Sequence, residues 1–251
     1  MHRRWLLKVI AGLALCPLCA RAWLSAEDAH WGYEGSDGPS AWGDLDPAYR
    51  VCAAGSQQSP IVIGSSIAAR LPPLEMKWTR RADTIVNNGH TIQINFNDGG
   101  SLKTGSGRYT LVQFHFHHPS EHIFGDKAFA IEAHFVHKGA SGSLAVVGVM
   151  LSADKANPVF AEIVASMPRT EGTQVKASPN IIPAGLLPAK RDYFLYEGSL
   201  TTPPCSETVA WHLLRVPIEV DTESVAAFAK LYPMNAMPVQ KLDRRFVLRS
   251  S

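Results

Sequence analysis

The chain lacks internal repeats and low-complexity segments, so nothing in the sequence argues for several repeated units. With 251 residues, 46% of them hydrophobic, it is long enough to bury a large core. A β-rich protein of this length is commonly one domain. We therefore expect a single domain over residues 23–251, preceded by a short leader.

No membrane-spanning segment is expected in the mature chain. The apolar stretch from Leu6 to Leu18 is too short to cross a bilayer comfortably. It follows Arg3 and Arg4 and precedes a small-x-small sequence at residues 20–22, an order typical of a secretory signal peptide. The sequence thus predicts that residues 1–22 are a signal peptide and that the protein is exported to a bacterial periplasm.

The leader also resembles a twin-arginine export signal. In that pattern a hydrophobic pair and often a lysine follow the two arginines, and here Leu6, Leu7 and Lys8 follow them after Trp5. Ordinary signal peptides can carry two arginines by chance, so both export routes stay open.

The mature chain lacks an excess of basic residues. The whole sequence has 24 lysines and arginines against 22 acidic residues, a formal net charge of +2. Arg3, Arg4, Lys8 and Arg21 lie in the predicted leader, so its removal leaves 20 basic against 22 acidic residues and a charge of −2. No basic stripe or arginine-rich tract remains, which argues against nucleic acid or an anionic membrane surface as a partner.

Cysteine is scarce. The chain has four, and Cys16 and Cys19 lie in the predicted leader, so the mature protein keeps only Cys52 and Cys205. In an exported protein this pair favours one disulfide. Closing so long a loop would stabilise the fold by roughly 4–5 kcal/mol in the chain-entropy model. Two buried free thiols are the alternative.

Helical patterns are few and short, whereas strand patterns recur along the chain. Helices are expected at residues 157–166 and at residues 222–231, the second begun by Asp221 or Thr222 and ended before Pro233. Residues 39–60 are rich in turn formers and are expected to be irregular. Strands are expected at residues 91–96, 111–118, 128–137, 144–151, 192–197 and 208–216. The predicted fold class is mostly β, with a large, mainly antiparallel sheet and short surface helices.

Three histidines on two of these predicted strands form the strongest candidate site. His115 and His117 are two residues apart, so their side chains share one face of a strand while Phe114 and Phe116 share the other. His134 lies on a second predicted strand. Three converging neutral imidazoles are a ligand set that zinc accepts while it keeps a fourth position open for water.

Gln113 and Glu132 support the metal-binding interpretation. Each lies two residues before a candidate ligand on the same strand face, where its side-chain oxygen can accept the second N–H of the imidazole and fix the tautomer. The alternative is a chance His-x-His pair in a chain that has ten histidines. A core-packing histidine would need no such partner.

Five further motifs accompany the histidines in a fixed order. They are Trp31-Gly32-Tyr33, Gln58-Ser59-Pro60-Ile61, Asn87-Asn88-Gly89-His90, Ser120-Glu121-His122 and Gly198-Ser199-Leu200-Thr201-Thr202-Pro203-Pro204. In this order and spacing they resemble the α-class carbonic anhydrases. The resemblance covers the chain from about His30 to Arg245.

The resemblance implies an α-carbonic anhydrase fold and the reversible hydration of carbon dioxide to bicarbonate and a proton. It implies that His115, His117 and His134 bind Zn²⁺, which lowers the pKa of its bound water from near 16 to about 7. Thr201 would accept a hydrogen bond from the bound hydroxide and donate its own proton to Glu121, which aims an oxygen lone pair at the substrate. Taken alone, Glu121 could be a salt-bridge partner and Thr201 a turn residue.

Two more roles follow from the resemblance. His90 matches the family's proton-shuttle position, where a relay of pKa about 6.5 helps a proton reach solvent; a loop residue without that role is the alternative. A small apolar wall for the substrate is expected from residues that composition alone would place in the core. These are Val136, Val146, Leu200 and Trp211, and the resemblance also places Thr202 in the substrate pocket. Expected ligands are carbon dioxide, bicarbonate, and sulfonamide and anion inhibitors, with ester hydrolysis as a side activity.

The resemblance also implies a bridge between Cys52 and Cys205, which would steady the loop that carries Thr201. It implies cis peptide bonds at Ser59-Pro60 and Pro203-Pro204. His118-Pro119 replaces the Trp-Gly of many family members, a departure more like bacterial forms. The remaining histidines are not expected to bind the metal: His30, His118, His122, His137 and His212.

Two other functions would explain fewer of these residues and motifs. A non-catalytic binding module on the same fold would have lost a zinc ligand, whereas this chain keeps all three histidines. A zinc hydrolase of another class would need a His-Glu-x-x-His helix, which the chain lacks.

Overall fold

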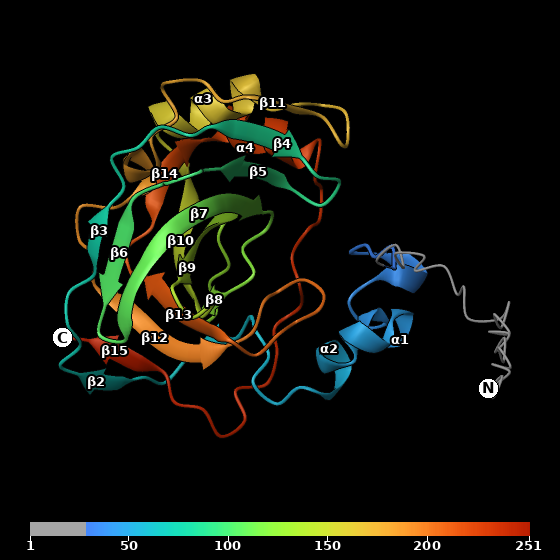
Figure 1. Ribbon diagram of the computed structural model, residues 1–251, viewed down its shortest axis with the longest axis vertical. Helices are drawn as coiled ribbons and strands as arrows, with labels where there is room; N and C mark the ends of the chain where they lie inside the picture. The colour runs from blue at the N-terminus through green and yellow to red at the C-terminus, as the bar shows by residue number, and fades with distance from the viewer. Residues whose placement is uncertain (1–28) are drawn as a thin grey trace, which may run out of the picture.

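The computed structural model describes residues 29–251, so the predicted signal peptide lies outside the described residues. This part of the chain forms one large sheet of 13 strands, a separate pair of two-residue strands and a few short helices (Figure 1). The strands are β1 (Val62–Ile63), β2 (Ile67–Ala69), β3 (Glu75–Lys77), β4 (Thr84–Asn87), β5 (Ile92–Asn95), β6 (Ser101–Thr104), β7 (Gly107–His117), β8 (Ile123–Phe124), β9 (Ile131–Gly139), β10 (Leu144–Asp154), β11 (Gln174–Lys176), β12 (Tyr193–Gly198), β13 (Val209–Leu214), β14 (Ile218–Asp221) and β15 (Leu248–Ser250).

The large sheet is mixed, with antiparallel neighbours in the majority. Its main path runs β11-β4-β5-β7-β9-β10-β13-β12-β15-β2, with β3, β6 and β14 paired beside it. Parallel pairs join β10 to β13 and β14, and β15 to β2. The expectation of a large, mainly antiparallel sheet is confirmed, and the long strands β7, β9 and β10 lie side by side at its centre.

All six predicted strands are present, with bounds that differ by a few residues. The largest difference is at β7, which begins at Gly107 because its first residues pair with β6, Thr104 opposite Gly107. The short strands at the sheet edges were not predicted. Segments of two to four residues, such as β2 and β11, are too short for an alternating pattern to be recognised.

The helices are short and lie at the ends or on one face of the sheet. They are η1 (Gly35–Asp37), α1 (Trp42–Leu45), η2 (Pro47–Tyr49), α2 (Val51–Ala54), α3 (Pro158–Ser166), η3 (Pro183–Leu186) and α4 (Thr222–Ala229). The expectation that residues 39–60 are irregular is wrong where α1, η2 and α2 form. Single helical turns of three or four residues leave no periodic signal in the sequence.

The two predicted helices form where side chains cap their first turns. Asn157 accepts hydrogen bonds from the backbone N–H groups of Val159 (3.0 Å) and Phe160 (3.1 Å) at the start of α3. At α4, Asp221 accepts one from the N–H of Ser224 (2.7 Å), so of the two expected caps it is the aspartate that acts.

The two faces of the central strands have different neighbours. On one face, the ring of Phe116 contacts Phe160 of α3 at 5.4 Å and Phe228 of α4 at 5.9 Å between ring centroids, so these helices cover the larger hydrophobic core (Figure 1). Because side chains alternate along a strand, His115 and His117 leave the opposite face. That face carries a second cluster around Trp211.

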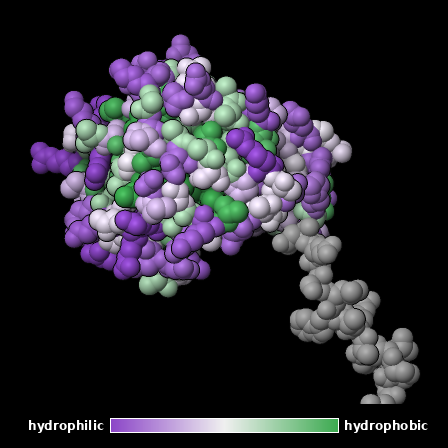
Figure 2. Space-filling model, turned by 90° about the horizontal axis from the view of Figure 1, so that it is seen from above, coloured by the Kyte–Doolittle hydropathy of each residue, from purple (hydrophilic) through white to green (hydrophobic). Residues whose placement is uncertain are grey.

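The surface is mixed in character. On the face seen in Figure 2, hydrophilic residues dominate and hydrophobic residues show in small patches. Within residues 29–251, no helix has both the length and the apolar character that crossing a membrane requires.

Candidate active site

The pairing of β7 with β9 brings the three predicted metal ligands together. His115 lies directly opposite His134, and His117 lies opposite Glu132. The ring centroids are 5.0 Å apart for His115 and His117, 5.3 Å for His115 and His134, and 4.5 Å for His117 and His134. One nitrogen from each ring lies within 4.8 Å of the others, a spacing suited to one metal ion. The grouping predicted from the sequence is therefore present.

One nitrogen of each ring makes a hydrogen bond that orients the ring. His115 Nδ1 donates to Gln113 Oε1 (2.8 Å), and His134 Nε2 donates to Glu132 Oε1 (2.9 Å), as the sequence predicts. His117 Nδ1 donates to the backbone oxygen of Asn235 (2.7 Å). Since these acceptors carry no proton, the ring proton lies on the bonded nitrogen, and the opposite nitrogen keeps its lone pair.

The backbone acceptor for His117 was missed by reasoning from the sequence. Asn235 lies 118 residues downstream and contributes a carbonyl oxygen, a group that every residue has. The side chain of Asn235 also donates to the backbone oxygens of His90 (2.9 Å) and Phe116 (3.0 Å), which fixes the position of this residue. Only the folded chain can reveal such a contact.

The residues fit a metal ion. His117 Nε2 is buried and has no hydrogen-bond partner among residues 29–251, although a buried polar atom is normally paired. Burial lowers the pKa of all three imidazoles, and that of His117 falls to about 3. The rings are therefore neutral near pH 7, which is the form that binds a metal.

Glu132 is buried and joins the ligand set to a second network. Its carboxylate accepts hydrogen bonds from His134 Nε2, from His122 Nδ1 (2.8 Å) and from the backbone N–H of His122 (2.8 Å). Burial alone would raise the pKa of this carboxyl, but the two histidines hold it well below its usual range. His122 Nε2 lies 2.6 Å from the hydroxyl of Tyr196, so His122 has the structural role expected of it.

Glu121 is buried beside the ligand set. Its Oε1 accepts a hydrogen bond from the backbone N–H of Met237 (2.8 Å) and lies 3.2 Å from His117 Nδ1. Burial, and then the nearby Glu132, raise the pKa of Glu121, while the N–H of Met237 and the Thr201 hydroxyl lower it. Oε2 has no partner with full hydrogen-bond geometry among the described residues. The backbone thus holds one carboxylate oxygen, and the other has no hydrogen-bond partner in the described chain.

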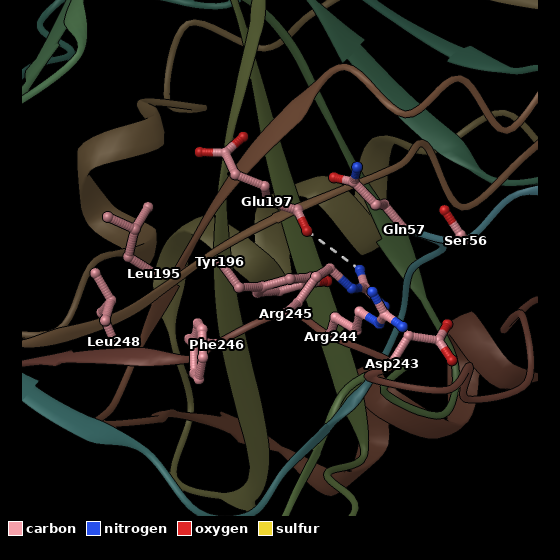
Figure 3. A pocket seen from close by; sticks show the side chains of 10 residues that line it. All are labelled: Ser56, Gln57, Leu195, Tyr196, Glu197, Asp243, Arg244, Arg245, Phe246 and Leu248. Atoms are coloured by element: carbon pink, nitrogen blue, oxygen red, sulfur yellow. Dashed lines mark hydrogen bonds between the residues drawn. The ribbon is translucent and has the colours of Figure 1, made fainter.

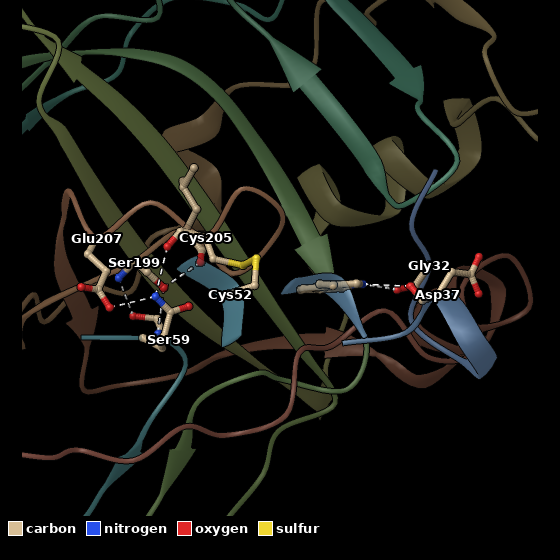
Figure 4. The surroundings of a disulfide bond; sticks show 10 residues. Gly32, Asp37, Cys52, Ser59, Ser199, Cys205 and Glu207 are labelled. Atoms are coloured by element: carbon tan, nitrogen blue, oxygen red, sulfur yellow. Dashed lines mark hydrogen bonds between the residues drawn. A yellow bond between two sulfur atoms is a disulfide. The ribbon is translucent and has the colours of Figure 1, made fainter. Parts of the chain in front are cut away.

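The loop that carries Thr201 is tied to the N-terminal part of the chain. A disulfide joins Cys52 and Cys205, 153 residues apart in sequence (Figure 4). Beside it, the backbone N–H of Ser59 donates to Ser199 Oγ (2.9 Å), and the N–H of Ser199 donates to Ser59 Oγ (3.1 Å). The predicted bridge is present, and these contacts hold both ends of the loop.

Gln58 adds two further contacts to the same loop. Its side-chain amide donates to the backbone oxygen of Cys205 (3.1 Å) and to Glu207 Oε1 (2.9 Å) (Figure 4). Leu200 N–H also donates to the backbone oxygen of Ser206 (3.1 Å) across the loop. Thr201 is thus carried by a loop with several independent anchors.

Four of the predicted wall residues lie together. Val136, Val146 and Trp211 are direct partners across β9, β10 and β13 and are at most 9% exposed. Leu200 packs against the same cluster. Val136 and His134 are two residues apart on one strand, so the wall adjoins the ligand set. Thr202 lies in the anchored loop, where its backbone oxygen accepts from the N–H of Cys205 (2.9 Å).

His90 lies in the turn between β4 and β5 and is partly exposed. Its imidazole stacks on Trp31, with ring centroids 3.7 Å apart and an angle of 8° between the planes. Burial lowers the pKa of His90, and His30 lowers it further, while Glu171 raises it. The described structure thus gives His90 one stacking partner and a route to solvent.

The chain matches known proteins over nearly its whole length. The family model described as eukaryotic-type carbonic anhydrase matches residues 37–250. The chain belongs to this family. A relative named carbonic anhydrase from Nostoc sp. is 37% identical over 259 residues, covering 100% of this chain and 98% of that protein. Another, from Pectobacterium carotovorum, is 38% identical and covers 89% of this chain and 92% of its own length.

Solved structures of carbonic anhydrases have the same fold. The α-carbonic anhydrase from Thermovibrio ammonificans, in complex with the inhibitor sulfanilamide, is 43% identical, with a TM-score of 0.86 over 88% of this chain and 100% of that chain. The α-carbonic anhydrase fold expected from the sequence is therefore confirmed. The chain is a carbonic anhydrase, a lyase whose general reaction is the hydration of carbon dioxide.

Three peptide bonds before proline are cis in the described chain. The Ser59-Pro60 and Pro203-Pro204 bonds are cis, as expected, and His118-Pro119 is also cis, which was not foreseen. His118 Nδ1 bonds to the backbone oxygen of Pro233 (3.0 Å), outside the ligand set.

The remaining histidines also lie outside the ligand set. His137 and His212 are buried, and each bonds to a backbone oxygen through Nδ1. His30 lies 3.5 Å from Asp37 at the surface. None of the three belongs to a group of potential metal ligands in the described chain.

A separate hollow lies at the edge of β12, lined in part by Leu195, Phe246 and Leu248 (Figure 3). Arg245 crosses it and donates to the backbone oxygens of Glu197 (3.1 Å) and Gln58 (2.8 Å). These hydrogen bonds tie the C-terminal segment to the segment that carries Ser59. The hollow shares none of the predicted catalytic or metal-binding residues.

Proposed function

We propose that the chain catalyses the reversible hydration of carbon dioxide to bicarbonate and a proton with Zn²⁺ held by His115, His117 and His134. The observation that carries this proposal is the buried, unpartnered Nε2 of His117 beside two other neutral imidazoles. Three nitrogen ligands with one open position suit a catalytic zinc. When bound, zinc would lower the pKa of a water so that hydroxide is available near pH 7.

Thr201 and Glu121 would orient the nucleophile. The N–H of Met237 fixes one oxygen of Glu121, which leaves the other free to accept the proton of the Thr201 hydroxyl. A hydroxyl that donates to a carboxylate must accept from its other neighbour, so Thr201 would select one orientation of the attacking oxygen. The disulfide and the Ser59–Ser199 pair support this role because they restrain the loop.

The wall formed by Val136, Val146, Leu200 and Trp211 would hold the substrate. Carbon dioxide has no net charge and no hydrogen-bond donor, so apolar side chains can place it beside the ligand set without competing for it strongly. The indole N–H of Trp211 donates to the backbone oxygen of Ser199 (3.0 Å), which keeps the polar edge of the ring away from the wall. Thr202 would complete the pocket from the loop.

His90 would carry the released proton to solvent. It is partly exposed, its turn adjoins the ligand set through Asn235, and its ring stacks on Trp31. An imidazole that titrates near neutral pH can accept a proton on one side and release it on the other.

Two further expectations belong to this proposal. The predicted signal peptide would direct the protein to a bacterial periplasm, where a Cys52–Cys205 disulfide is stable. Sulfonamides and small anions would inhibit by binding at the metal, as the sulfanilamide complex of the Thermovibrio ammonificans enzyme suggests. The same activated water would also hydrolyse reactive esters slowly.

A stopped-flow assay of carbon dioxide hydration tests the proposal. Protein of measured zinc content should accelerate hydration, lose that acceleration on chelation and regain it when zinc is added back. Acceleration that is independent of zinc would overturn the assignment of the metal. No acceleration by fully loaded protein would overturn the proposed reaction.

A further inference from the structure

We infer that Glu171 is a positioning residue for proton transfer, with its carboxylate held beside His90 so that it stabilises the protonated imidazole. The inference rests on the proposed role of His90 as the proton shuttle. It concerns a residue 81 positions downstream of His90, in the loop between α3 and β11.

Glu171 lies in a turn that is closed by its own backbone. The N–H of Thr173 donates to the oxygen of Thr170 (3.2 Å), and Gly172 has a φ of +74°, which suits the third position of a type II turn. Glu171 is the second residue of this turn. Its side chain therefore leaves from a backbone of defined shape, although the residue is at the surface.

This turn is docked onto the segment that carries His90. The N–H of Gly172 donates to the backbone oxygen of Asn87 (2.8 Å), and the N–H of Asn87 donates to the oxygen of Thr173 (3.1 Å). The side-chain amide of Asn87 donates to the oxygen of Pro168 (3.2 Å). Three hydrogen bonds through one residue thus join the two segments.

Gly89 leaves room for the carboxylate next to His90. A Cβ atom on Gly89 would lie 2.4 Å from Glu171 Oε1 and 2.8 Å from its Cδ, closer than nonbonded atoms can approach. Gly89 also has a φ of +87°, and its N–H donates to Asn87 Oδ1 (3.1 Å). The Glu171 carboxylate therefore occupies the position of a missing side chain, one residue before His90.

Three charged or titratable groups surround this position. His30 in the N-terminal segment and Glu171 in the docked turn both act electrostatically on His90, and the Tyr232 hydroxyl bonds to Asn87 Oδ1 and to the backbone oxygen of Thr91 (3.1 Å). Burial and His30 lower the pKa of His90, and among these three groups only Glu171 raises it. Glu171 thus offsets the two effects that would make His90 a poor proton acceptor.

Loss of the Glu171 charge should affect proton transfer and no other step of the reaction. Transfer from the metal site to His90 is fastest when the pKa of His90 is not far below that of the donor. Removing the negative charge should lower the pKa of His90, because the Glu171 carboxylate favours the protonated imidazole. The conversion of carbon dioxide itself does not involve His90, so kcat should fall while kcat/KM stays constant.

The test compares zinc-loaded wild type, Glu171→Gln and the control Glu162→Gln, which removes an equivalent charge from α3. NMR titration of the His90 imidazole, assigned with His90→Ala, should show a lower pKa in Glu171→Gln than in the wild type and an unchanged pKa in the control. In a buffer that transfers protons poorly, kcat of Glu171→Gln should fall about twofold, and added salt should shrink the difference.

Two results would overturn the inference. An unchanged pKa of His90 in Glu171→Gln would show that the carboxylate does not act on the imidazole. A parallel loss of kcat/KM or zinc content would show a purely structural role. If His90→Ala leaves kcat unchanged, the proposed shuttle fails and the role of Glu171 in proton transfer fails with it, whatever the titration shows.

Discussion

The three ligand histidines and His90 are held in opposite ways. His115, His117 and His134 lie on two paired strands, and each has one ring nitrogen fixed by a hydrogen bond. In the described chain the His90 ring only stacks on Trp31, and its hydrogen bonds are made by its backbone. A metal needs ligands that do not move, whereas a proton relay must turn between the site and solvent.

The comparison also separates two sources of rigidity. The three histidines are positioned by the pairing of β7 with β9, so one face of the sheet carries all three imidazoles. Thr201 and His90 lie on loops, and each loop needs its own anchors. The disulfide anchors the first loop, and the hydrogen bonds of Asn87 anchor the second.

Removing a ligand should have the largest effect. His117→Ala should lose zinc, and hydration activity should fall by about 1000-fold or more, because the metal supplies several kcal/mol of transition-state stabilisation. Metal analysis with stopped-flow kinetics measures both. His118→Ala is the matched control, since His118 bonds to Pro233 outside the ligand set. Full zinc content in His117→Ala would contradict the assigned ligand set.

Removing the orienting hydroxyl should have the next largest effect. Thr201→Ala should keep its zinc and lose about 100-fold in kcat/KM, because the nucleophile would no longer be aimed. Thr201→Ser keeps a hydroxyl beside Glu121 and should retain most of the activity. Equal losses of kcat/KM in the two variants, measured in the same assay, would show that the hydroxyl does not orient the nucleophile.

A ligand histidine without its orienting hydrogen bond should have a more mobile ring, as His90 has. Gln113→Ala removes the acceptor of His115 Nδ1 and should weaken zinc binding by about 10- to 100-fold. Competition with a chelator of known affinity measures the change. Gln174→Ala, on the exposed strand β11, is the control and should bind zinc as tightly as the wild type. An unchanged affinity in Gln113→Ala would rule out a role for this hydrogen bond.

Buried histidines outside the site should make the fold sensitive to acid. Burial lowers the pKa of His137 to about 3 and that of His212 to about 4, whereas an unfolded histidine titrates near 6.5. Between pH 6.5 and 4 the unfolded chain therefore binds more protons, so the free energy of unfolding falls as pH falls.

Denaturation of zinc-free protein at several pH values measures this effect. His212→Gln removes one such group and should reduce the slope between pH 6.5 and 4 by up to about 1.4 kcal/mol per pH unit. Gln174→Ala, on the exposed strand β11, removes no titrating group and should leave the slope unchanged. Identical slopes in His212→Gln and wild type would contradict the neutral, buried state of His212.

The ligand set and the long strands could be predicted because their signals are local. Alternation along β7 places His115 and His117 on one face, and Gln113 follows the same periodicity. Asn235 and the turn around Glu171 could not be predicted in this way, because each meets its neighbour across a large sequence separation through backbone hydrogen bonds. The short edge strands and single-turn helices were missed because a few residues carry no period.

The most direct test of this comparison is the dependence of kcat and kcat/KM on buffer concentration in His90→Ala. The account predicts full zinc content, an unchanged kcat/KM, and a kcat reduced on the order of 10- to 100-fold in dilute buffer. Added imidazole should restore kcat by accepting the proton in place of His90. A kcat that matches wild type in dilute buffer, or a loss of kcat/KM that imidazole does not repair, would contradict it.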